Sequence, residues 1–81
     1  MATNITGFAR EVACLVHGFY QEAGDAFLIN NKVGDKIGSV RRKKGRRNYF
    51  IWNGEEEIET DNAGDASEHI QYGPLFKECF F

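Results

Sequence analysis

The sequence predicts an α+β fold: an N-terminal amphipathic helix packed on a four-stranded antiparallel β-meander, followed by a short helical or irregular C-terminal segment. Two observations lead to it. Apolar residues recur at steps of three and four along residues 5–23, and turn-forming pairs with glycine then divide the chain at even spacing. With 81 residues, 42% of them hydrophobic, we expect residues 1–81 to form a single domain with one core.

The first element is a helix over residues 5–23. Thr3 or Asn4 can cap its first amides, and Gly24 stands where a helix commonly ends. Gly18 inside it costs about 1 kcal/mol relative to alanine, which indicates either a close contact there or a tolerated loss. The residues that we expect to be buried against the sheet are Phe8, Val12, Leu15, Val16 and Phe19.

Four strands follow, joined by two-residue turns at Gly34-Asp35, Lys44-Gly45 and Asn53-Gly54. Their expected bounds are 26–33, 36–43, 46–52 and 55–61. These turns fix a register in which one row crosses the sheet, with Phe27 and Ile51 on the same face. The row consists of Ile29, Val40, Tyr49 and Ile58.

The opposite face is also too apolar to stay bare in a monomer. Either the C-terminal tail covers it or it is an interface. Asp65-Ala-Ser-Glu68 resembles a capping box that starts a short helix, which Gly73-Pro74 would end. The apolar residues of the opposite face are Leu28, Ile37, Phe50 and Trp52, and those of the tail are Ile70, Tyr72, Leu75, Phe76, Phe80 and Phe81.

The chain lacks both a run of about 20 apolar residues and the features of a secretion signal. We therefore expect a cytoplasmic protein without membrane contact, in which Cys14 and Cys79 are free, buried thiols. These cysteines with His17 and His69 would complete a zinc set, but the spacing is weak support. We expect no metal, no cofactor and no small-molecule substrate.

A strong charge separation underlies the net charge of −2. Residues 32–47 are basic, and the two-residue turn would place Lys43 opposite Arg46 and Arg42 opposite Arg47. Because the sequence retains this repulsion, we expect the positive tip to serve binding to phosphates or to an acidic protein surface. The alternative is a solvated hairpin in which Arg46 pairs with Asp61. The candidate binding residues are Arg41, Arg42, Lys43, Lys44, Arg46 and Arg47, with Phe50 and Trp52 as aromatic surface for stacking on bases.

The acidic segment after this hairpin offers a second candidate interface, because a line of carboxylates can mimic phosphates. A solvated edge strand is the alternative. Acid–base catalysis is a weaker reading, since no partner that would tune these carboxyl groups is visible. The residues are Glu55, Glu56, Glu57, Glu59 and Asp61.

In its small size, charge polarity and lack of catalytic signatures the chain resembles phage-encoded inhibitors such as anti-CRISPR proteins. This similarity covers composition only and transfers no residue. We expect a small non-enzymatic binding protein whose basic hairpin contacts an anionic partner, either nucleic acid or an acidic protein surface. The alternative is an inhibitor that binds a host nucleoprotein complex and blocks its nucleic-acid site. The oligomeric state stays open.

Overall fold

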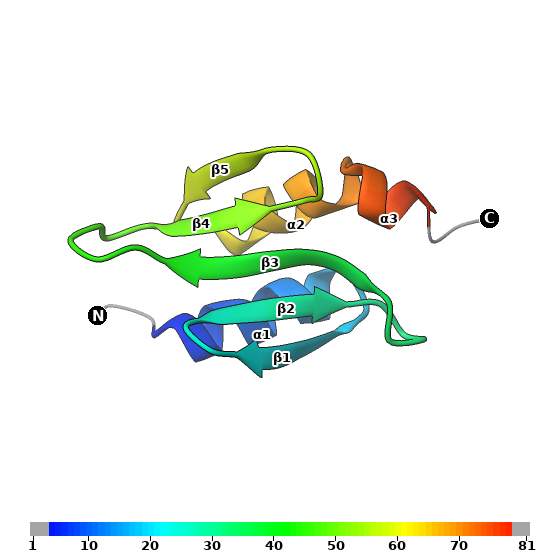
Figure 1. Ribbon diagram of the computed structural model, residues 1–81, viewed down its shortest axis with the longest axis horizontal. Helices are drawn as coiled ribbons and strands as arrows, with labels where there is room; N and C mark the ends of the chain where they lie inside the picture. The colour runs from blue at the N-terminus through cyan, green and yellow to red at the C-terminus, as the bar shows by residue number, and fades with distance from the viewer. Residues whose placement is uncertain (1–3, 79–81) are drawn as a thin grey trace.

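The computed structural model describes residues 4–78. Within these residues one antiparallel sheet holds five strands in chain order, and three helices accompany it (Figure 1). The α+β class is confirmed, with one strand more than the sequence predicted. The elements are α1 (Ile5–Leu15), β1 (Phe19–Ala23), β2 (Ala26–Asn30), β3 (Lys36–Arg42), β4 (Tyr49–Trp52), β5 (Glu57–Thr60), α2 (Ala63–Gln71) and α3 (Pro74–Glu78).

Helix α1 begins as predicted but ends eight residues early, at Leu15 instead of Ala23. The Asn4 side chain caps it, accepting a hydrogen bond from the Gly7 N–H at 2.8 Å. At the other end His17 adopts a left-handed conformation (φ 59°), and the Gly18 N–H donates a hydrogen bond to the Ala13 carbonyl at 2.8 Å. A Cβ on Gly18 would collide with the carbonyl of Asn30, so a close contact explains this glycine.

Residues 19–23, predicted as the last turns of the helix, form the edge strand β1 instead. Gly24 (φ 66°) does not cap a helix but belongs to the two-residue turn between β1 and β2. Phe8, Val12 and Val16 are buried as expected, whereas Leu15 and Phe19 are 44% and 62% exposed. The helix prediction was therefore wrong for these two side chains.

The predicted register is displaced by two residues at each of the three pairings it covered. The connections 31–35, 43–48 and 53–56 are longer than two-residue turns, so each strand begins later or ends earlier than predicted. Because an even shift keeps every side chain on its face, the core face was still assigned correctly. The row across the sheet is Phe27, Val40, Ile51 and Ile58, in place of the predicted one.

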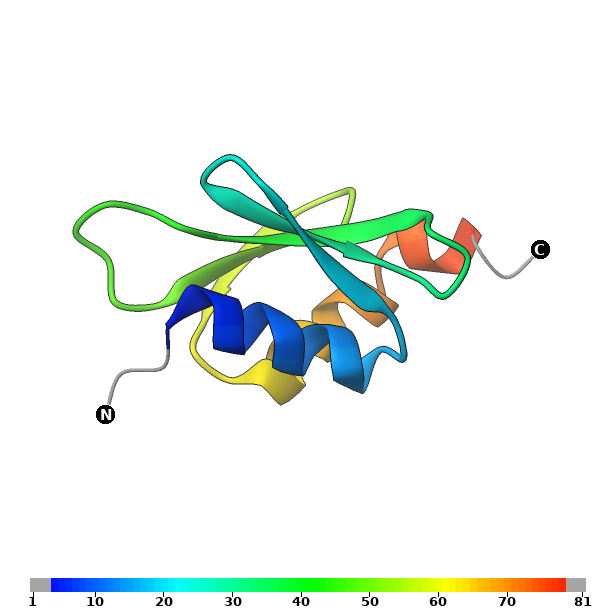
Figure 2. The same cartoon turned by 90° about the horizontal axis from the view of Figure 1, so that it is seen from below.

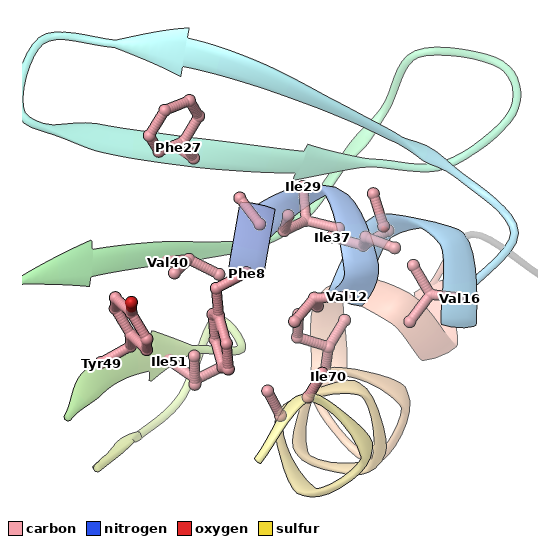
Figure 3. Close-up of a cluster of buried hydrophobic side chains, with 14 residues drawn as sticks. Phe8, Val12, Val16, Phe27, Ile29, Ile37, Val40, Tyr49, Ile51 and Ile70 are labelled. Atoms are coloured by element: carbon pink, nitrogen blue, oxygen red, sulfur yellow. The ribbon is translucent and has the colours of Figure 1, made fainter. Parts of the chain in front are cut away.

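Ile37 lies in the core and not on the opposite face. Opposite Ile29 and Asn30, strand β3 supplies Gly38 and Lys36, so Ile37 is the extra residue of a β-bulge. A bulge interrupts the alternation of side chains, and Ile37 is fully buried beside Ile29 (Figure 3).

Helix α2 covers the same face of the sheet as α1, so the prediction that the tail covers the opposite face was wrong for its described part (Figure 2). Ile70 is fully buried in the common core, and Phe76 of α3 packs against it. The cap of α2 is Asn62, which accepts from the Asp65 N–H at 3.0 Å, three residues before the predicted start. Phe80 and Phe81 lie outside the described residues. Over residues 4–78 no helix has the length and apolar character needed to cross a bilayer.

Asn53 fixes the acidic strand β5 relative to α2. This buried side chain donates to the His69 carbonyl at 3.0 Å and accepts from the N–H groups of Glu55 and Glu56 at 2.9 and 3.0 Å. The pairing of β5 with β4 is thereby held at its start. This pairing places the carboxylates that face the basic hairpin.

Candidate anion-binding site

The face of the sheet turned away from α1 and α2 is the open face, seen from the front in Figure 1. Two rows of cross-strand neighbours lie on it. Each row runs from the edge strand β1 to the acidic strand β5 and includes one of the predicted aromatic residues. The rows are Gln21, Leu28, Ser39, Trp52 and Glu57, and Ala23, Ala26, Arg41, Phe50 and Glu59.

The basic arm, residues 41–47, extends beyond the rest of the sheet (Figure 1). Strand β3 ends at Arg42 and β4 begins at Tyr49, so neither predicted pair of opposed cations, Lys43 with Arg46 or Arg42 with Arg47, is part of a ladder. A turn closed by the Arg46 N–H and the Lys43 carbonyl at 3.1 Å, with Gly45 at φ 81°, forms the tip. The like charges are thus spread over a loop and not stacked across strands.

Strand β5 neutralises part of this arm. Glu57 binds both Arg41 and Lys43 at 3.0 Å, and Glu59 binds Arg46 at 2.6 Å. The partner of Arg46 is therefore Glu59 and not Asp61. The basic and acidic segments, which are separate along the sequence, meet on the open face.

Two of the paired cations also lie over the ring of Phe50. Lys43 Nζ is 4.3 Å and the Arg46 guanidinium carbon 5.8 Å from the ring centroid. The ring of Phe50, which the sequence predicted to stack on bases, is thus already in contact with two cations of the same chain. Trp52, the other predicted stacking residue, is half-buried in the neighbouring row.

Three cations of the arm form no ion pair with any described residue: Arg42, Lys44 and Arg47. All three are exposed, and Arg42 lies 5.7 Å from the ring centroid of Tyr49. The arm and the β1–β2 turn line a shallow, wide-open hollow of about 590 Å³. Its lining is Asp25, Arg42, Lys43, Lys44, Gly45 and Arg46, so cations outnumber the single carboxylate.

Nothing in the sequence indicated that Asp25 lies beside the arm, because its position depends on the β1–β2 hairpin. The pairing of the arm with Glu57 and Glu59 could have been predicted. Arg41 and Lys43, like Glu57 and Glu59, are spaced by two, and strands two apart in a meander can present such charges on one face.

The other predicted acidic residues lie around β5. Glu55, Glu56 and Asp61 are exposed, and none of them forms an ion pair within residues 4–78. The Glu56 carbonyl accepts a hydrogen bond from His69 Nε2 at 2.9 Å. The acidic segment thus divides into carboxylates that face the basic arm and carboxylates that face solvent.

The residues of the weak zinc pattern are not assembled in the described chain. Cys14 is exposed on α1, contrary to the expected buried thiol, and His17 lies beyond the end of that helix. His69 belongs to α2, and Cys79 lies outside the described residues. In residues 4–78 no three His, Cys, Asp or Glu side chains are grouped so that they could hold a metal ion.

Glu57 gives the site a dependence on pH. Partial burial acts to raise the pKa of this carboxyl, but hydrogen bonds and charge from Lys43 and Arg41 outweigh it and hold the pKa below its ordinary value. A carboxyl with a depressed folded-state pKa stabilises the fold above its ordinary pKa, and this contribution is lost as pH falls through the folded-state value.

Glu57→Gln is therefore expected to cost about 0.5–1 kcal/mol at pH 7, the range of partly exposed ion pairs, and the difference from the native chain should vanish in acid. Denaturant unfolding between neutral pH and about pH 3 measures this. Glu55→Gln is the matched control, since Glu55 forms no ion pair in the described region and should cost little at either pH. A pH-independent loss in Glu57→Gln would contradict the ion-pair explanation.

Comparison with protein-family models, with curated proteins and with solved structures finds no match.

Proposed function

We propose that the protein is a non-enzymatic binding protein whose basic arm contacts the phosphates of a nucleic acid. One observation carries the proposal: Arg42, Lys44 and Arg47 have no carboxylate partner among the described residues, yet they gather on a projecting loop beside a hollow rich in cations. Charges held in this way attract polyanions and release their counterions on binding.

The paired cations give the arm a defined shape. Glu57 and Glu59 hold Arg41, Lys43 and Arg46 against the open face, which keeps both the base and the tip of the loop in place. A loop ordered before binding loses less conformational entropy when it binds. Trp52, half-buried on the same face, offers aromatic surface to an unpaired base that follows the backbone off the arm.

The test is a titration of the native protein with a labelled single-stranded oligonucleotide and with a duplex of mixed sequence, at several salt concentrations. For three phosphate contacts the logarithm of the binding constant should fall with the logarithm of salt at a slope of about −2 to −3. Binding that does not depend on salt would contradict phosphate contact. Binding to an acidic protein but to neither oligonucleotide would favour the acidic protein surface as the partner.

An inhibitor of a host nucleoprotein complex is the second proposal retained from the sequence. Its acidic interface would use Glu55, Glu56 and Asp61, because cations of the same chain already neutralise Glu57 and Glu59. The geometry supports it less than the basic arm. A protein of this kind needs no affinity for plain nucleic acid, so the same titration separates the two proposals.

A further inference from the structure

Within residues 4–78, strand β1 is an edge of the sheet with no strand on its outer side, and neither the predicted function nor the proposed one uses it (Figure 1). All five of its residues are exposed. Phe19 and Tyr20 are 62% and 37% exposed, a large aromatic surface for a short strand. The strand contains no lysine, arginine or proline, and none of its pairs with β2 is irregular, so Glu22 is its one charged protection as an edge.

The opposite edge of the sheet differs in this respect. Strand β5 carries Glu57 and Glu59, and Glu55, Glu56 and Asp61 flank it. Two such strands brought side by side would repel each other through Glu55, Glu56 and Asp61, which no cation of residues 4–78 neutralises. The two edges therefore differ in what they permit, and only β1 can pair with its own copy without opposing like charges.

The backbone geometry of β1 fits such pairing. Ala23 and Ala26 flank the two-residue turn and form a hydrogen-bonded pair, so the ladder alternation directs the backbone groups of Phe19, Gln21 and Ala23 toward β2. The N–H and carbonyl groups of Tyr20 and Glu22 then point to the outer edge. In an antiparallel pair centred on Gln21, Tyr20 of each copy faces Glu22 of the other, and every one of these outward groups finds a partner.

The side chains suit the same register. Gln21 meets Gln21 of the second copy at the two-fold axis, and Phe19 on the open face meets the small Ala23. On the helix face, Tyr20 lies opposite Glu22, whose carboxylate can accept from the phenol. No like charges are opposed anywhere in the pairing.

We propose that β1 is a self-association edge, through which two copies pair in antiparallel fashion about Gln21 into one continuous sheet. A two-fold axis perpendicular to the sheet leaves both open faces on the same side, so the surface that carries the basic arms becomes continuous over both copies. This interface does not depend on nucleic-acid binding.

The experiment measures molecular mass by sedimentation velocity over a concentration series up to about 1 mM, where even an association of about −4 kcal/mol is half-populated. The average mass of the native chain should rise from 9.2 kDa toward twice that value as the concentration increases. Gln21→Lys and Gln21→Glu should each be monomeric, because like charges then meet at the axis. An equimolar mixture of the two variants should dimerise again, which a folding defect would not allow.

Gln71→Lys is the matched control, since it makes the same change of charge at the end of α2, and it should dimerise like the native chain. A native chain that stays monomeric over the whole series overturns the proposal. Gln21 variants that dimerise as the native chain does, or a mixture that stays monomeric when each variant alone is folded by circular dichroism, overturn it as well.

Discussion

Replacing Ile70 with alanine is expected to lower the free energy of unfolding by about 2–5 kcal/mol, the range for truncating a filled core position. Ile70 on α2 is fully buried and packs on Gly38 of β3, where an added Cβ would come within 2.9 Å of Ile70 Cγ1. The close approach of helix and strand leaves little freedom to collapse into the space that the isoleucine vacates. Figure 3 shows this side chain between α2 and Val12 of α1.

Leu15→Ala is the comparison variant, because the sequence placed Leu15 in the core, whereas the structure leaves it 44% exposed. Its loss should stay below about 1 kcal/mol, as for a surface position. Denaturant unfolding followed by circular dichroism measures both variants. A loss of about 2 kcal/mol or more in Leu15→Ala would mean that Leu15 faces the sheet as the sequence suggested. A loss below about 1 kcal/mol in Ile70→Ala would mean that α2 contributes no more than a surface helix.

The start of α1 was predictable because its signals are local. Asn4 can cap only the amides that follow it, and the spacing of Phe8, Val12 and Val16 admits one buried face. The end was not predictable from periodicity, because Phe19 continues the spacing of Leu15 by chance. The helix is stopped by His17, which adopts a left-handed conformation. Glycine usually occupies such a position, and here Gly18 follows one residue later, so the sequence did not indicate His17.

The faces of the sheet were predictable and its pairings were not. Alternation of side chains depends only on parity, and the loops shifted each register by two residues, which preserves parity. The bulge at Ile37 breaks parity, and so this residue was assigned to the wrong face. Cross-strand partners depend on the register itself, which is why Glu59 and not Asp61 was found beside Arg46.

The residues of the candidate site were visible as a charge run, but their division into two sets was not. The predicted hairpin placed all six cations of the arm at one tip and gave a carboxylate partner, Asp61, to Arg46 alone. In the structure Arg41, Lys43 and Arg46 are bound to glutamates of β5, whereas Arg42, Lys44 and Arg47 pair with no carboxylate of the described chain. The sequence therefore located the charge run, and the structure separates the cations held by glutamates from those without a carboxylate partner in residues 4–78.

This division leads to the largest expected effect on binding. The triple substitution Arg42→Gln, Lys44→Gln and Arg47→Gln should weaken affinity for an oligonucleotide by about tenfold or more at low salt. It should also reduce the salt slope by about two to three units, since each lost phosphate contact removes nearly one. Stability should be little changed, because these exposed side chains form no ion pairs in residues 4–78.

The matched variant neutralises the paired set, Arg41→Gln, Lys43→Gln and Arg46→Gln, and changes the net charge by the same amount. Its unfolding free energy should fall, because Glu57 and Glu59 lose their partners, while Arg42, Lys44 and Arg47 still offer their phosphate contacts. We therefore expect a smaller loss of salt slope than in the first variant, together with a stability cost that the first lacks. If the two variants lose the same affinity and slope, only net charge attracts the partner, and the arrangement of the arm has no role in recognition.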